Sequence, residues 1–344
     1  MLFVAACGGD DDDSTTADAT TTEEATTEEA TTEAAPEPVN LAFFPFSFDN
    51  VYIASAIDEY KTLVAENPDV TMEYFDAGFD TEVQLGQIRD ATASGKFDGF
   101  IITPTDGVAL IPGIEDAIAA GIEVICSESP CGPEVGTIET QLDGQLAFTS
   151  VNSAVDGELY AELAIEGCEG IDPCKVAFIQ GFATNTNDAA RLDAFNEGIA
   201  DAANIEVVAT VEGFFAQADA FKQAQTVLQA NPDLNMFVTA GDQMTFGAQQ
   251  AAEEIGLVAG EDILLIGGSA ATESLVEICE GRWLGSTIYL PRTAAQQSLD
   301  IMVRTLGGEE GLGSVDTRDE SPVGPSYTLE DCESGFEGEW SIGG

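Results

Sequence analysis

The amino-acid sequence predicts an α/β fold of two lobes, each a parallel sheet doubly wound with helices. After residue 38, apolar runs of strand length alternate with segments of helical periodicity. This alternation is typical of parallel sheets covered by helices on both faces. The predicted strands are too numerous for one compact sheet, and the order of elements begins again near residue 154. The chain is long enough for two lobes of ordinary domain size.

The first series of elements runs from residue 40 to residue 126. An apolar run at 40–47 predicts a strand, and apolar residues recur at helical spacing from Val51 to Val64. Residues 98–104 (DGFIITP) contain consecutive apolar residues, which indicate a buried strand. The other elements of this series are strands at 70–77 and 122–126 and helices at 51–66, 81–94 and 108–120.

A second series of the same kind follows and predicts the second lobe. Its strands are expected at 175–181, 205–211, 236–240, 263–267 and 286–290. Its helices are expected at 154–166, 189–203, 218–230, 245–255, 273–281 and 293–306. In open parallel sheets, ligands bind beyond the carboxyl ends of the strands, so the site is expected in the loops that follow these strands.

The N-terminal residues resemble the lipobox of a bacterial lipoprotein. Cys7 follows Val4, Ala5 and Ala6, and a cysteine in that setting is expected to carry the lipid anchor. Only six residues precede Cys7, too few for a complete signal peptide, so we expect the start to be truncated within a signal and lipobox at 1–7. The alternative is a chance cysteine in a disordered tail.

Residues 8–38 predict a disordered acidic tether rich in Thr and Glu. The segment holds eleven acidic residues and no basic one, and TTEEA repeats in it. It has no apolar face to bury, and its like charges repel one another. The whole chain carries 63 acidic residues against 10 Lys and Arg, a net charge of −53. Such a surface repels nucleic acid and anionic lipid, so only the lipid anchor is expected to bring the protein to the cell membrane.

The six cysteines beyond Cys7 predict three disulfides rather than a metal site. Two pairs are close in sequence, and the economical assignment leaves one long pair. The expected bridges are Cys126–Cys131, Cys168–Cys174 and Cys279–Cys332. Zinc is the competing use of clustered cysteines, but the chain has no Cys-x-x-Cys and no His.

Catalysis and cofactor binding find little support in the sequence. The absence of His removes Ser-His-Asp and Cys-His catalysis and most metal sites. No Gly-Lys-Ser or Gly-Lys-Thr of a Walker loop occurs, and GGSA at 267–270 lacks the dinucleotide-binding fingerprint. The sequence therefore predicts a protein that is not an enzyme and that uses no cofactor and no metal.

Several segments together resemble type I periplasmic sugar-binding proteins, of the ribose-binding kind. They are DGFIITPTDGVAL (98–110), AIAAGIEVI (117–125), KVAFIQG (175–181) and ANPDLNMFVTAGDQMTFGAQQAAEEIG (230–256), and the likeness covers 41–308. The resemblance implies two lobes joined by a three-segment hinge that closes around a ligand in the cleft. With these boundaries, the first lobe is 39–150 plus 290–322, and the second is 151–289 plus 323–344. A monomer is expected.

The resemblance also implies ligand residues. The loop after the first strand usually offers Asn followed by aromatic residues, and here it holds Phe48, Asn50 and Tyr52. The family's cleft arginine matches Arg191, and its second-lobe aromatic residue matches Phe215. Aromatic faces suit the C–H faces of a sugar, and Asn and Arg suit its hydroxyls. The alternatives are a core position for Phe48 and a surface ion pair for Arg191.

The expected site also includes Glu128, Asp242, Ser269 and Tyr289, and the sequence departs from the family pattern at or beside these positions. Glu128 and Ser129 replace an Asp-Arg pair, and Gly241 replaces the Asn before Asp242. Ser269 replaces an Asp, and Tyr289 replaces a hinge Gln. The cleft is therefore expected to have fewer charged contacts and more aromatic surface than a ribose site. An N-cap role is the alternative for Asp242.

The predicted function is an extracytoplasmic, lipid-anchored solute-binding protein. It is expected to capture a small neutral polyhydroxylated ligand, a sugar or polyol, and to deliver it to an ABC permease. The alternative is a receptor of the same fold that reports to a membrane sensor kinase. The sugar-responsive repressors that share this core need a helix-turn-helix ahead of it, and the acidic tether occupies that place.

Overall fold

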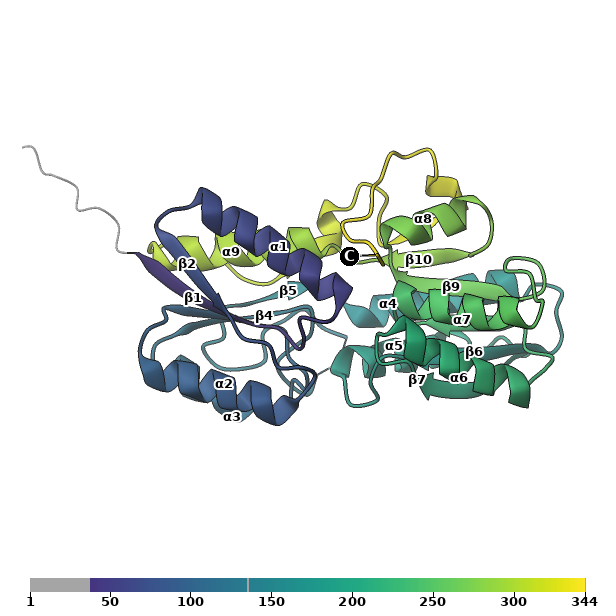
Figure 1. Cartoon of the computed structure of the whole chain (residues 1–344), viewed down its shortest axis with the longest axis horizontal. Helices are drawn as coiled ribbons and strands as arrows, with labels where there is room; N and C mark the ends of the chain where they lie inside the picture. The colour runs from purple at the N-terminus through teal and green to yellow at the C-terminus, as the bar shows by residue number, and fades with distance from the viewer. Residues whose placement is uncertain (1–37, 135, 344) are drawn as a thin grey trace, which may run out of the picture. The chain divides into compact units, whose positions relative to one another are not determined.

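The computed structural model describes residues 38–134 and 136–343 (Figure 1). These described residues belong to one compact unit. Cys7 and residues 8–37 of the predicted tether lie outside the described residues. Two six-stranded sheets organise the described part of the chain, as the sequence predicted. None of its helices is both long enough and apolar enough to cross a membrane.

The first sheet has the strand order β11-β5-β4-β3-β1-β2, and all its pairings are parallel. Its strands are β1 (Val39–Phe44), β2 (Val70–Tyr74), β3 (Gly99–Ile102), β4 (Glu123–Ser127), β5 (Ala147–Ser150) and β11 (Val315–Asp316). Helices α1 (Val51–Glu66) and α9 (Pro291–Leu306) pack together on one face, and α2 (Thr81–Ser94) and α3 (Ile111–Ala119) on the other (Figure 1). The central strand β3 is buried throughout because helices cover both faces.

The second sheet has the order β12-β10-β9-β8-β6-β7, in which only the edge strand β12 is antiparallel. Its strands are β6 (Cys174–Gln180), β7 (Ile205–Glu212), β8 (Met236–Thr239), β9 (Leu264–Ser269), β10 (Gly285–Ile288) and β12 (Ser326–Thr328). Helices α4 (Ser153–Gly167) and α5 (Thr186–Gly198) share one core cluster. Helices α6 (Gln217–Ala230), α7 (Asp242–Glu254) and α8 (Thr272–Cys279) share another.

The chain passes between the two sheets three times. It leaves the first sheet after β5, returns after β10 to form α9, and crosses again between β11 and β12. These passages are the three-segment hinge that the family resemblance implied. The C-terminal tail adds a further link, because buried Trp340 packs its ring 5.6 Å from that of Tyr52 on α1.

Some predicted elements differ from the observed ones for local reasons. Strand β1 ends at Phe44 rather than residue 47, because Pro45 has no backbone N–H to continue the ladder. Helix α3 begins at Ile111 rather than residue 108, because the backbone N–H groups of Val108 and Ala109 donate hydrogen bonds to the Asp106 carboxylate in a turn ahead of the helix. Strands β5, β11 and β12, of four, two and three residues, were not predicted.

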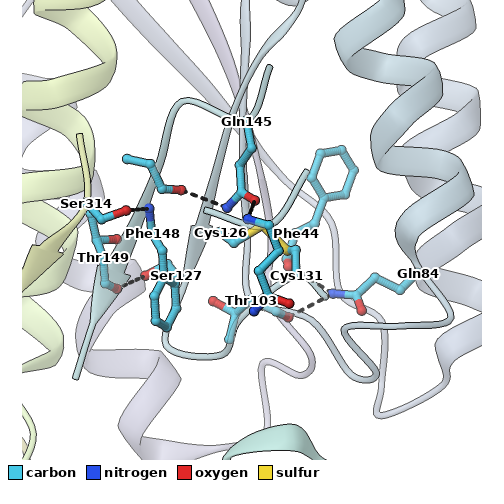
Figure 2. The surroundings of a disulfide bond; sticks show 12 residues. Phe44, Gln84, Thr103, Cys126, Ser127, Cys131, Gln145, Phe148, Thr149 and Ser314 are labelled. Atoms are coloured by element: carbon cyan, nitrogen blue, oxygen red, sulfur yellow. Dashed lines mark hydrogen bonds between the residues drawn. A yellow bond between two sulfur atoms is a disulfide. The ribbon is translucent and has the colours of Figure 1, made fainter. Parts of the chain in front are cut away.

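The structure places the sulfur atoms of all three expected cysteine pairs at bonding distance. Their Cα atoms lie 6.0, 5.8 and 5.7 Å apart for Cys126–Cys131, Cys168–Cys174 and Cys279–Cys332, within the range that a disulfide requires. Figure 2 shows the first pair next to Phe44 and Thr103, whose carbonyl oxygens accept hydrogen bonds from the buried amide of Gln84.

Candidate ligand-binding site

A cavity of about 60 Å³ lies where loops of both sheets leave the carboxyl ends of their strands. This is the edge at which open parallel sheets bind ligands. Seven of the predicted site residues line it, namely Asn50, Tyr52, Glu128, Arg191, Phe215, Ser269 and Tyr289. The other lining residues are Phe46, Ser129, Asn185, Asn187, Ala240 and Gln243.

Glu128 is the buried carboxyl group on the first-lobe wall. It follows β4 with a positive φ of 65°, a conformation that is uncommon outside glycine. The Tyr52 hydroxyl donates a 2.5 Å hydrogen bond to Glu128 Oε2. Burial raises the pKa of Glu128 to about 8, although the hydrogen bond from Tyr52 opposes that shift. Glu128 is therefore mainly protonated and neutral at neutral pH.

Two residues that line the cavity each have one buried side-chain oxygen without a hydrogen-bond partner. These oxygens are Glu128 Oε1 in the first lobe and Gln243 Oε1 in the second. A buried polar atom without a partner costs roughly 1–3 kcal/mol. A ligand with hydroxyl groups would remove that cost on both walls, because a hydroxyl both donates and accepts hydrogen bonds.

Arg191 lines the cavity, but its guanidinium is held by protein groups. Its Nε donates to Asp156 at 3.2 Å, its Nη1 to Asp188 at 3.1 Å and its Nη2 to the Tyr289 hydroxyl at 2.5 Å. The guanidinium also lies over the Tyr289 ring, 5.3 Å from its centroid. Arg318 donates to the second oxygen of Asp156 at 2.9 Å. The two arginines thus balance Asp156 and Asp188, and neither offers an unpaired positive charge to the cavity.

Two predicted site residues have structural partners that account for their positions, and a third lies away from the cavity. The Asn50 side chain caps α1 by accepting a hydrogen bond from the Ile53 N–H, although it still lines the cavity. Asp242 is fully buried outside the cavity wall and accepts hydrogen bonds from the Ala271 N–H and the Ser274 hydroxyl. The side chain of Phe48 is 39% exposed and also lies outside the cavity wall. The structure therefore does not bring Asp242 and Phe48 to the site.

The sequence reasoning missed four polar or aromatic residues of the wall. Asn185 caps α5 and lies at the cavity, and Asn187 donates to the Glu128 carbonyl and the Ser129 hydroxyl across the two lobes. Phe46 lies in the loop after β1, and Gln243 directly follows the predicted site residue Asp242. All four stand in loops or first helical turns after a strand end, and that position is the signal that could have identified them.

The Phe215 ring depends on a neighbouring glycine. Phe215 has a positive φ of 49°, and its ring passes so close to Gly181 that a Cβ atom there would overlap it. Gly181 directly follows β6. Because Gly181 has no side chain, the Phe215 ring can lie against the carboxyl end of this strand and line the cavity.

Among residues 38–134 and 136–343, no group of three or more His, Cys, Asp or Glu side chains is placed to hold a metal ion.

The fold and the interlobe cavity together define a type I periplasmic binding protein. The sequence profile of the periplasmic binding protein domain matches residues 41–310. The chain therefore belongs to that family, and the resemblance read from the sequence is confirmed. The family consists of substrate-binding proteins rather than enzymes.

Similar proteins agree with this membership. The D-ribose/D-allose-binding protein of Pseudomonas aeruginosa is 24% identical, over 84% of this chain and 88% of its own. The galactofuranose-binding protein YtfQ of Escherichia coli is 25% identical, over 67% of this chain and 71% of its own. A Mycobacterium smegmatis protein solved in complex with β-D-fucofuranose has a TM-score of 0.76 at 19% identity, over 86% of this chain and 93% of that one.

Proposed function

We propose that this protein is an extracytoplasmic solute-binding protein that captures a small neutral polyhydroxylated ligand, a sugar or polyol, and delivers it to an ABC permease. The observation that carries the proposal is the pair of unpartnered buried oxygens, Glu128 Oε1 and Gln243 Oε1, on facing lobes of an aromatic-lined cavity. A ring that carries hydroxyl groups satisfies such atoms, while its C–H faces pack on aromatic rings.

The charges of the wall favour a neutral ligand. Glu128 is mainly protonated at neutral pH, because burial raises its pKa to about 8. Arg191 is already paired with Asp156 and Asp188. An anionic ligand would therefore find no unpaired cation among the wall residues that the structure describes. The ligands named for the similar proteins, ribose, allose, galactofuranose and fucofuranose, are all neutral sugars.

A thermal-shift screen followed by isothermal titration tests the proposal. The panel contains D-ribose, D-allose, D-galactose, L-arabinose, D-fucose and myo-inositol, together with common disaccharides. A ligand that binds only the folded state raises the melting temperature by mass action. We expect at least one member to bind, and Gln243→Leu, which removes one unpartnered oxygen, to weaken it by about tenfold. If no member of the panel binds the folded protein, the proposal fails.

We propose in addition that Cys7 is lipidated and anchors the protein to the cell membrane through the acidic tether. The support is the lipobox-like sequence before Cys7 and the acidic surface charge, which leaves a covalent anchor as the route to the membrane. The test is to express the chain with a complete signal sequence and fractionate the cells. Cys7→Ser should move the protein to the soluble fraction. Equal membrane retention of Cys7→Ser and the natural sequence would contradict the anchor.

A further inference from the structure

A second cavity of about 80 Å³ adjoins the first. Phe46, Asn185 and Phe215 line both cavities, so a ligand in the first cavity lies directly beside the second. The remaining lining residues are Phe79, Thr81, Pro104, Thr105, Phe182 and Thr184. The proposed solute of the first cavity does not by itself account for this space.

The wall of the second cavity has the chemistry of a carbohydrate subsite. It offers four phenylalanine rings, three Thr hydroxyls and one Asn amide, and none of its lining residues is charged. Buried Gln84 fixes Thr105 by accepting hydrogen bonds from its N–H at 2.8 Å and its hydroxyl at 2.9 Å. Aromatic faces with a few fixed polar groups suit the C–H faces and hydroxyls of a sugar ring.

Phe79 contributes to this wall in a way that core packing does not explain. Its φ of 62° is a conformation that bulky residues rarely adopt, yet its side chain is 38% exposed. Its ring stacks on Phe46 with centroids 5.3 Å apart and meets Phe182 of the other lobe at 5.7 Å. Strained residues that are not required by the core are concentrated at ligand-binding positions.

We propose that the second cavity binds a second sugar ring, so that the ligand is a disaccharide whose first ring occupies the first cavity. This inference rests on the proposed function and narrows its ligand class. Because Phe46, Asn185 and Phe215 line both cavities, the two cavities adjoin, and two covalently linked rings can occupy them together. The uncharged wall of Phe rings and Thr hydroxyls matches a second neutral ring and gives no partner to a charged group.

The test is isothermal titration of the full chain with D-glucose, D-galactose, D-ribose and L-arabinose, and with lactose, melibiose, cellobiose and maltose. We expect at least one disaccharide to bind about tenfold or more tightly than either of its component sugars. Phe79→Ala should remove most of that difference and leave monosaccharide affinity within about twofold. Phe48→Ala is the matched control, because Phe48 is equally exposed at 39% but lines neither cavity.

Two results would overturn the inference while the proposed function stands. In the first, monosaccharides bind and no disaccharide binds more tightly than its components. In the second, Phe79→Ala weakens monosaccharides and disaccharides equally, which would mean that the Phe79–Phe182 contact only holds the lobes together. Absence of binding by every sugar would refute the proposed function and this inference with it. Circular dichroism of each variant verifies that the fold is retained.

Discussion

Asp156 and Arg318 form a buried ion pair, 2.9 Å between Oδ1 and Nη1, that joins the two lobes near the hinge. Asp156 belongs to α4 of the second lobe, and Arg318 follows β11 of the first sheet. The other oxygen of Asp156 accepts from Arg191 and from the Tyr289 hydroxyl. The Asp156 carboxylate therefore contacts Tyr289 after β10, Arg191 on the cavity wall, and Arg318 ahead of the last passage between the two sheets.

Removal of Arg318 should destabilise the fold strongly. Arg318→Ala leaves part of a buried carboxylate uncompensated, and breaking a buried pair in this way costs about 3–5 kcal/mol. Because Arg191 still faces Asp156, we expect a loss near the lower end, about 3 kcal/mol in the free energy of unfolding. Urea denaturation measures it.

Arg304→Ala is the control for that experiment. Arg304 also pairs with two carboxylates, Asp300 and Glu309, but its side chain is 44% exposed. Exposed ion pairs contribute about 0–1 kcal/mol. Equal losses in the free energy of unfolding for Arg318→Ala and Arg304→Ala would show that the buried ion pair contributes no more to stability than an exposed one.

Glu128 should make the stability of the empty protein depend on pH. Burial raises its pKa to about 8 in the folded state, so the folded protein binds this proton more tightly than the unfolded chain does. Its contribution is fully present below the unfolded pKa, near 4.3, and is lost as the pH rises through about 8. The natural protein should therefore lose up to about 1.4 kcal/mol per pH unit in this interval relative to Glu128→Gln.

Urea denaturation of both proteins at several values between pH 5 and pH 8 gives this difference directly. Other carboxylates contribute equally to both proteins, so their effects cancel in the comparison. Parallel stability profiles for Glu128→Gln and the natural sequence would mean that Glu128 titrates in its ordinary range.

The three disulfides should appear as the pairs Cys126–Cys131, Cys168–Cys174 and Cys279–Cys332 in non-reduced peptide mapping. In the chain-entropy model, the two short loops stabilise by about 2 kcal/mol each and the long one by about 4 kcal/mol. Selective loss of Cys279–Cys332, by replacing both residues with Ser, should therefore cost the most in urea denaturation. A free thiol at any of the six positions, or a crossed pair, contradicts the assignment.

Truncation of Phe215 should weaken ligand binding without unfolding the protein. Its ring lines both cavities, so Phe215→Ala should lower the affinity for the tightest ligand of the screen by about 2–4 kcal/mol, or roughly 30- to 1,000-fold. Isothermal titration measures the change. Phe214→Ala is the matched control, because Phe214 also has a positive φ but lines neither cavity. Equal effects of the two variants would place the ligand elsewhere.

The structure changes what is expected of Arg191. The sequence suggested a side chain free to bind a ligand hydroxyl, whereas three of its nitrogen atoms are hydrogen-bonded to Asp156, Asp188 and Tyr289. Arg191→Ala would remove a ligand contact, but it would also displace Tyr289 and take one cationic partner from both Asp156 and Asp188. A loss of affinity in this variant would therefore combine several effects. For this reason Phe215 tests the binding site more cleanly than Arg191 does.

The sequence by itself determined the order of elements and the edge of the sheets at which the site lies. The strands and helices from 40 to 306 follow hydrophobic periodicity, which depends on neighbours along the chain. The family resemblance then indicated Tyr52, Glu128 and Phe215, and the structure places all three on the wall of one cavity at this edge. The pairs Cys126–Cys131 and Cys168–Cys174 could be predicted from the sequence because their members are close along the chain.

Only the tertiary structure decided which polar groups are satisfied and which remain free for a ligand. Asp156 meets Arg318 from 162 positions away. Asp156 also pairs with Arg191, and together with Asp188 it leaves Arg191 without free charge. Asn187 reaches the Glu128 carbonyl of the other lobe, while Glu128 Oε1 and Gln243 Oε1 find no partner. Local sequence patterns contain no information on such contacts, because hydrogen bonds between distant segments exist only after the lobes have packed.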